Sequence, residues 1–122
     1  MDRLLADMFT RLPHAMLFLS TIIGLPKRND CYYWPDGEIN QQALGITFNS
    51  MLPAIVKKYQ SPPHSRQVYL VDMLNSTQVG VQGKDTCPCH IHPTDHGYDL
   101  MAQVFFESMQ RKLPALGGGI GV

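Results

Sequence analysis

The chain has 122 residues, which is enough for one small domain or for part of a larger one. Apolar residues make up 44% of it and charged residues only 16%, a balance typical of a packed globular protein and not of a disordered chain. Ten basic residues offset ten acidic ones, so the net charge gives no reason to expect a nucleic acid or a membrane surface as a partner.

The first quarter of the sequence predicts a helix followed by a strand. Apolar residues at helical spacing predict a helix over residues 2–12, with Asp2 as its cap and Pro13 at its end. The nearly continuous apolar run over residues 15–22 predicts a strand that is buried on both faces. That run superficially resembles a signal peptide, but acidic residues precede it, no small-residue cleavage site follows, and it is too short to span a membrane.

A loop and a long helix come next. Residues 24–37 have the composition of a loop, and the three aromatic residues at positions 32–34 either line a substrate cleft or, as we prefer, cover the end of the sheet. Apolar residues at three- and four-residue steps predict a helix over residues 38–59, which Pro53 should kink or divide. Asn49 on this helix is interpreted as a polar surface residue.

The last third of the sequence predicts a second strand and a final helix. Residues 61–65 form a loop by composition, and residues 67–73 a strand with Asp72 near its end. Residues 74–88 are interpreted as irregular. A last helix is predicted from about residue 95 to residue 112, and packing in the core explains its apolar stripe.

The alternation of helices and strands defines the fold class. Three helices separated by two strands predict parallel β-α units in an α/β fold with layers of helices against a sheet. We expect one structural unit over residues 1–116. Residues 117–122 are so rich in glycine that we expect a flexible tail.

One block near the C-terminus carries the most specific pattern. It consists of His92-Pro93, then Gly97-Tyr98, then Met101-Ala102. This spacing resembles the last conserved block of the SGNH (GDSL-type) esterase and lipase family, D-x-x-H-P-x-x-x-G-Y-x-x-M-A. The histidine of that block is the general base that activates a catalytic serine, so the resemblance implies that His92 is the catalytic residue of this chain.

The resemblance extends over nearly the whole chain in the right order. Residues 17–22 resemble a late strand of the family, residues 48–56 its helix with an F-N-x-x-L-P pattern, and residues 68–73 the strand before the catalytic loop. The match covers only the C-terminal part of the family domain. It implies the C-terminal portion of a three-layer α/β/α, flavodoxin-like fold with a parallel sheet.

Several parts of the family's catalytic machinery are missing from this sequence. There is no G-D-S block with a nucleophile and no G-x-N-D block with an oxyanion-hole asparagine, and none of the serines lies in a G-x-S-x-G elbow. Cys89 stands where the family has the triad aspartate, and Asp85 replaces that residue only if the loop bulges. We therefore expect the chain to be inactive alone.

The cysteines allow two further readings of the same loop. Cys87, Cys89, His90 and His92 form a C-x-C-H-x-H cluster that could bind zinc or copper, although its spacing is unlike that of a C-x-x-C knuckle. Cys89 as a thiol nucleophile beside His92 is chemically allowed, but no oxyanion hole is evident. We expect no metal and no organic cofactor, and the pairing of Cys31 with Cys87 or Cys89 stays open.

Two functions follow as hypotheses. The first is the C-terminal segment of a carboxylic-ester hydrolase that acts on a small ester or acylated substrate, with its serine in a region not represented here. The second is a non-catalytic remnant, a pseudoenzyme that serves as an interaction module. Two parallel strands do not form an independent sheet, so in both cases we expect self-association through an exposed sheet edge. The family is often extracellular, but no convincing export signal precedes residue 15.

Overall fold

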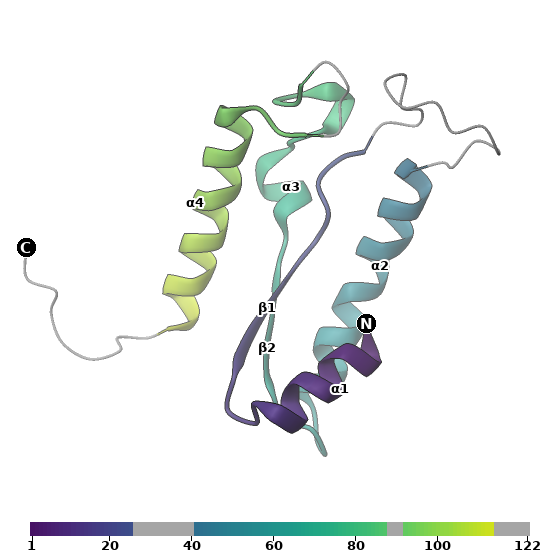
Figure 1. The fold of residues 1–122 in the computed structure, drawn as a ribbon, viewed down its shortest axis with the longest axis vertical. Helices are drawn as coiled ribbons and strands as arrows, with labels where there is room; N and C mark the ends of the chain where they lie inside the picture. The colour runs from purple at the N-terminus through teal and green to yellow at the C-terminus, as the bar shows by residue number, and fades with distance from the viewer. Residues whose placement is uncertain (26–40, 88–91, 114–122) are drawn as a thin grey trace, which may run out of the picture.

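The computed structural model describes residues 1–25, 41–87 and 92–113 (Figure 1). In these ranges the helices and strands are, in order, α1 (Asp2–Arg11), β1 (Met16–Ser20), α2 (Gln41–Gln60), β2 (Gln67–Val71), α3 (Met73–Thr77), the short 3-10 helix η1 (Val81–Gly83) and α4 (Asp95–Lys112). The protein is a small α/β structure with helices packed on strands, which confirms the predicted class.

The two strands pair in parallel and separate two layers of helices. The register aligns Leu17 with Val68 and Phe18 with Tyr69. Because side chains alternate along a strand, the first pair lies on one face of the sheet and the second pair on the other. Helices α1 and α2 lie on one side of the strands and α4 on the other (Figure 1).

The core lies between the sheet and the first two helices. Leu5 and Phe9 of α1 pack with Val56 and Tyr59 of α2 over Val68 of β2, and each of these side chains is buried. The rings of Phe9 and Tyr59 lie 5.9 Å apart between centroids, a distance at which aromatic pairs attract. These contacts hold α1 and α2 on one face of the sheet.

The first helix begins differently from the prediction. Met1 and not Asp2 occupies the N-cap position, and Asp2 lies in the first turn, where the helix dipole favours a negative charge. The Lys58 Nζ donates to the Asp2 Oδ2 at 2.8 Å. This hydrogen bond holds the pKa of Asp2 below its ordinary value and raises the pKa of Lys58. Both side chains are at least half exposed, so the ion pair orients α1 on α2 but stabilises little.

The predicted burial of the first strand is wrong. All five residues of β1 are only partly buried, whereas Val68 and Val71 of β2 are fully buried. In the described ranges the sheet has only these two strands, so each has one open edge and neither is enclosed as a central strand would be. The strands differ because Val68 of β2 lies within the core formed with α1 and α2, whereas Leu17 and Leu19 of β1 only pack against that core.

Two other predicted features can be compared with the structure. Pro53 does not divide α2, which runs through it from Gln41 to Gln60, and Pro53 lies on the exposed side, where water can replace the missing donor. The segment interpreted as irregular contains α3 and η1. Asp72 caps α3 by accepting a hydrogen bond from the Asn75 backbone N–H, and such a short helix leaves no periodic signal in the sequence. The aromatic residues at positions 32–34 and the tail lie outside the described residues.

The two long helices each leave large apolar side chains exposed to solvent. Leu44 and Ile46 of α2 are 60% and 61% exposed, and Tyr98 and Phe106 of α4 are exposed as well. Gly97 is the one buried residue of α4, and Met101, Val104, Phe105 and Met109 of its apolar stripe are only partly buried, so the stripe packs less completely than predicted. No helix in the described part of the chain is long and apolar enough to cross a membrane.

The difference between the covered and uncovered parts of α2 can be measured with one matched pair of substitutions. Leu52 is 1% exposed and Leu44 is 60% exposed on the same helix. We expect Leu52→Ala to lower the free energy of unfolding by about 2–5 kcal/mol because it leaves a cavity. Leu44→Ala should change it by less than about 0.5 kcal/mol. Urea unfolding followed by circular dichroism measures both, and equal effects would contradict this description of the core.

Candidate functional site

The candidate site lies at the carboxyl end of the strand pair, where ligands bind in open α/β sheets. The segments that leave the two strands are tied together there. The Thr21 backbone N–H donates to the Val71 carbonyl at 3.0 Å, and the Thr21 Oγ1 accepts from the Leu74 backbone N–H at 3.0 Å. Thr21 is nearly buried, so these bonds fix the exits of β1 and β2 relative to each other.

Two glycines allow the next segments to touch. The Gly24 N–H donates to the Val79 carbonyl at 2.8 Å. A Cβ placed on Gly24 would lie 2.5 Å from the backbone of Gly80, and a Cβ on Gly80 would collide with the Gly24 carbonyl oxygen. Gly80 also has a φ of +80°, which residues with a side chain rarely adopt. Glycine is therefore required at both positions for this close approach.

Asn49 is a structural anchor and not the surface residue that we predicted. Its Oδ1 accepts from the Ile22 backbone N–H at 2.7 Å, and its Nδ2 donates to the Ile22 carbonyl at 2.8 Å. The side chain thus satisfies both backbone groups of the residue after the β1 exit. A signal was present in the sequence, because Asn49 lies at helical spacing from the buried Leu52 and Val56 and so shares their face.

His92 lies in a loop whose backbone is held on both sides. Thr86 and Pro93 form an isolated antiparallel bridge. The Cys87 N–H donates to the His92 carbonyl at 2.8 Å, and the Thr94 N–H donates to the Asp85 carbonyl at 2.8 Å. The His92 side chain is exposed, so its ring is open to solvent while its backbone is fixed.

The start of α4 is fixed by the same loop. Thr94 is the N-cap, and its Oγ1 accepts from the Gly97 N–H at 3.2 Å. Asp95 lies in the first turn, where the helix dipole favours a negative charge. A Cβ on Gly97 would lie 2.5 Å from the Asp85 carbonyl oxygen, so glycine lets the helix approach the loop closely. The Pro, Gly and Tyr of the motif therefore surround the turn that presents His92.

Asp85 lies under the first turn of α4. It has a φ of +53°, and its Oδ2 is buried without a hydrogen-bond partner among the described residues. Within the same part of the chain, no hydrogen bond joins the Asp85 carboxylate to the His92 ring. Asp85 and His92 are thus on paired segments, but the replacement of the triad aspartate that the sequence suggested is not formed in this geometry.

The structure describes only some of the other candidate residues. Cys31, Cys89 and His90 lie outside the described residues, which leaves their roles as predictions. Residues 1–25, 41–87 and 92–113 contain no group of three or more histidine, cysteine or acidic side chains that could hold a metal ion. Ser20 and Ser50 donate to backbone carbonyls, and no serine hydroxyl in those ranges bonds to His92.

No family model, curated protein or solved structure matches this chain significantly. The described residues define an α/β unit with two parallel strands and an exposed histidine just before α4, on a segment paired with residues 85–87.

The role of Asn49 can be tested by removing both of its hydrogen-bonding groups. Asn49→Leu leaves the partly buried N–H and C=O of Ile22 without these partners, and we expect it to lower the free energy of unfolding by about 1–3 kcal/mol. The neighbouring Ser50→Ala is the control, because Ser50 is exposed and its hydroxyl bonds only within its own helix. Urea unfolding of both variants is the measurement, and an unchanged midpoint for Asn49→Leu would show that the anchor is dispensable.

Proposed function

We propose that this chain is the C-terminal portion of an SGNH-type carboxylic-ester hydrolase and that His92 is its general base. The observation that carries the proposal is the presentation of His92, whose backbone is fixed by the bridge between Thr86 and Pro93 while its side chain is exposed. A base must reach a substrate or a nucleophile from a defined position, and this arrangement provides both access and a fixed backbone.

The reaction requires groups that this chain does not supply. A serine hydroxyl from another part of the enzyme would attack the ester carbonyl carbon while His92 takes the hydroxyl proton. His92 would then return the proton to the departing alcohol, and water would release the acyl group by the same sequence of steps. Donors for the oxyanion would also come from elsewhere, because the G-x-N-D block is missing.

The strand pair supports a larger sheet in the complete protein. The outer edge of β1 pairs with no other strand in the described ranges, and its side chains are only partly buried. A further strand on this edge, with its own helices, would complete a three-layer structure and cover these side chains. We propose that the missing nucleophile block belongs to that additional part.

The proposal predicts that the chain alone has no esterase activity and that a fusion supplying the missing catalytic blocks is active. We expect no turnover of p-nitrophenyl acetate by the chain alone, and no labelling by a fluorophosphonate. Fusion to the N-terminal half of an SGNH hydrolase that contains the G-D-S and G-x-N-D blocks should create esterase activity. His92→Ala should lower the kcat of that fusion by about 10²- to 10⁴-fold, the usual contribution of a general base.

The matched control for that experiment is His96→Ala. His96 is exposed in the first turn of α4, four residues from His92. Its loss should leave the activity of the fusion unchanged. Esterase activity that persists in His92→Ala, or serine labelling of the chain alone, would show that His92 is not the base or that the nucleophile lies within this chain.

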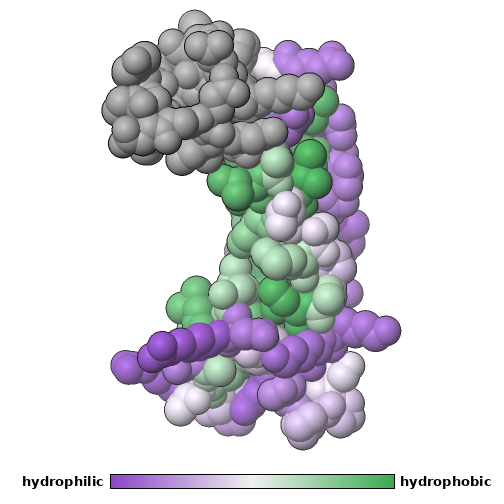
Figure 2. All heavy atoms as spheres, turned by 90° about the vertical axis from the view of Figure 1, so that its right-hand side faces the viewer, coloured by the Kyte–Doolittle hydropathy of each residue, from purple (hydrophilic) through white to green (hydrophobic). Residues whose placement is uncertain are grey.

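A second candidate function is an interaction module that associates with a second copy of itself. Figure 2 shows apolar side chains gathered on the face that α2 presents to solvent. Leu44 and Met51 lie seven residues apart on one side of α2, and both are exposed, which is unusual for a helix that also contributes to a core. The open edge of β1 adds a second surface on which another strand can pair.

Self-association can be tested with two substitutions on α2. Sedimentation velocity should show concentration-dependent association of the unmodified chain. Leu44→Lys should weaken it by about ten- to a hundredfold, because a fully buried apolar side chain contributes roughly 1.5–3 kcal/mol. Ser50→Lys adds the same charge at an exposed position on a different side of the helix and should have little effect. A monodisperse monomer with one sharp melting transition would exclude this candidate.

A further inference from the structure

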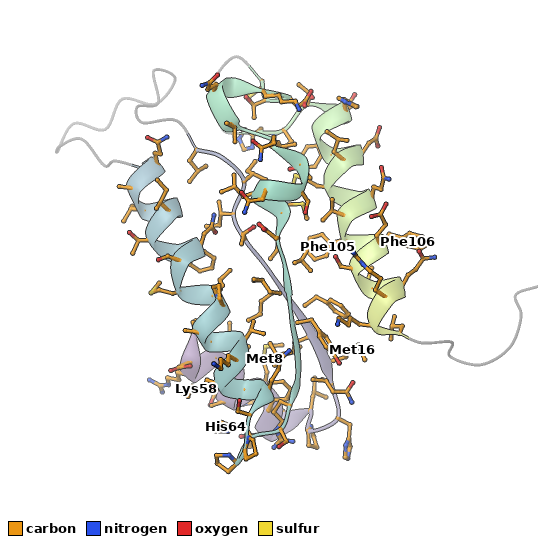
Figure 3. The ribbon with its side chains drawn as sticks, turned by 180° about the vertical axis from the view of Figure 1, so that it is seen from behind. Met8, Met16, Lys58, His64, Phe105 and Phe106 are labelled. Carbon is orange, nitrogen blue, oxygen red and sulfur yellow. The ribbon has the colours of Figure 1, made fainter. Side chains whose placement is uncertain are left out.

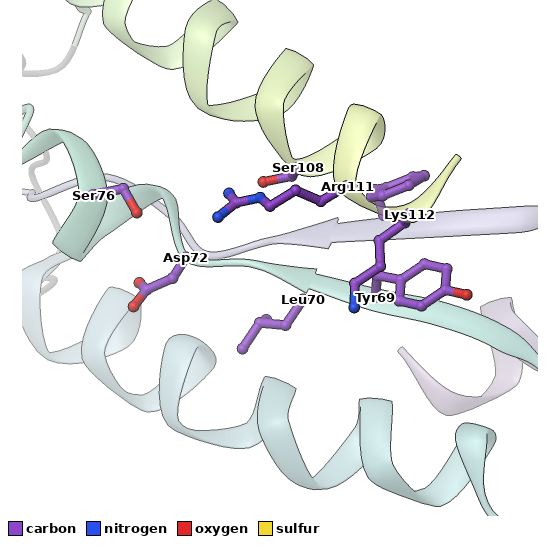
Figure 4. Close-up of a pocket in the computed structure, with 8 residues that line it drawn as sticks. Tyr69, Leu70, Asp72, Ser76, Ser108, Arg111 and Lys112 are labelled. Carbon is purple, nitrogen blue, oxygen red and sulfur yellow. The ribbon is translucent and has the colours of Figure 1, made fainter. Parts of the chain in front are cut away.

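A cavity on the opposite side of the sheet from the core has the features of a small-molecule site. It lies between β2 and the C-terminal half of α4 and has a volume of about 320 Å³. Its walls combine aromatic rings, hydroxyl groups and two cations from these elements (Figure 4). This volume is at the lower end of the range of small-molecule pockets, so the cavity fits a small ligand.

Two cations line the cavity without an ion pair. In the described part of the chain neither Arg111 nor Lys112 forms a salt bridge. The nearest acidic residue along the helix, Glu107, accepts from the Gln103 side chain at 2.9 Å. The Arg111 Nε donates to the Glu107 carbonyl at 3.2 Å, which leaves the terminal nitrogens of the guanidinium available. Figure 4 shows this guanidinium extended from α4 toward Ser76 and Asp72.

One carboxylate offsets part of this positive charge. Asp72 lines the cavity, and its oxygens accept from the backbone N–H and the Nδ2 of Asn75 at 3.3 and 2.8 Å. Two cations and one anion leave the cavity with one net positive charge. The hydroxyls of Ser76 and Ser108 also line it, and neither one bonds to another residue within the described ranges. They remain available as donors to a bound anion.

The remaining wall is aromatic. The rings of Phe18 and Tyr69, which are paired in the register of β1 and β2, lie 5.4 Å apart between centroids. The Lys112 Nζ lies 5.3 Å from the centroid of the Tyr69 ring. A ligand with a flat apolar body would contact these rings while its anionic group faces the cations and hydroxyls.

We propose that this cavity binds a small carboxylate with an aromatic body. The planar guanidinium of Arg111 matches the two oxygens of a carboxylate, and such paired, charge-assisted hydrogen bonds are among the strongest in proteins. The site is separate from His92. Ser108 lies 13 residues beyond the first residue of α4, which corresponds to about 20 Å along the helix. The binding site is therefore independent of the esterase proposal.

Phenylacetate is the probe that tests the site in the full chain. Isothermal titration should show saturable binding, and NMR should show shifts at the rings of Phe18 and Tyr69. Arg111→Gln should weaken binding by about tenfold or more, because a hydrogen bond to a charged group is lost. Asp72→Asn should tighten it by about fivefold, because one repulsive charge is removed and asparagine still caps α3. Phenylacetamide, which has no charge, should bind at least about tenfold more weakly than phenylacetate.

The control variant is Arg3→Gln, which removes an exposed cation from α1 on the other side of the sheet. It should leave the affinity for phenylacetate unchanged. Absence of saturable binding, equal affinity of the unmodified chain and Arg111→Gln, or equal weakening by Arg3→Gln would each overturn the proposal. Because Asp72→Asn is expected to act in the opposite direction, a tightened complex distinguishes a charge effect from a loss of folding.

Discussion

The parallel pairing of β1 with β2 is the interaction on which the rest of the structure depends. The five aligned pairs place Val68 under the core formed by α1 and α2, and they place Phe18 and Tyr69 on the face toward α4. The same pairing brings the two strand exits together, so that Thr21 can bond to the segments after β2. The pairing of these two short strands thus helps to position the core, the cavity and the histidine loop.

A sheet of only two strands leaves part of the apolar surface of the helices exposed to solvent. The core side of α2 is closed around Leu52 and Val56, but Leu44 and Ile46 near its beginning face solvent. Helix α4 contacts the sheet mainly through its later turns and leaves Phe106 exposed. Figure 3 shows Phe105 and Phe106 on α4, on the other side of the strands from the group around Met8, Lys58 and His64. The molecule is well packed on one face of the sheet and open on the other.

The sequence predicted the elements with strong periodicity and missed those held by single side chains. The approximate bounds predicted for α4 agree with the structure, because a long apolar pattern begins shortly after the Pro93 turn. Helix α3 was missed because five residues carry no periodic pattern and the helix depends on the Asp72 cap. The exposure of His92 could not be predicted, since it follows from hydrogen bonds between residues 85–87 and 92–94 that only the folded chain shows.

The geometry also limits what one chain can do. An ester hydrolase needs a hydroxyl within hydrogen-bond reach of its base, but Ser76 of α3 and Ser108 of α4 line the separate cavity beside β2. Ser20 and Ser50 donate to backbone carbonyls. Under the esterase proposal, the nucleophile for His92 would therefore come from outside the described part of the chain. The open edge of β1 is one surface on which a further strand could pair, and addition there would cover its partly buried side chains. Under that proposal, the same additional part would complete both the sheet and the catalytic group.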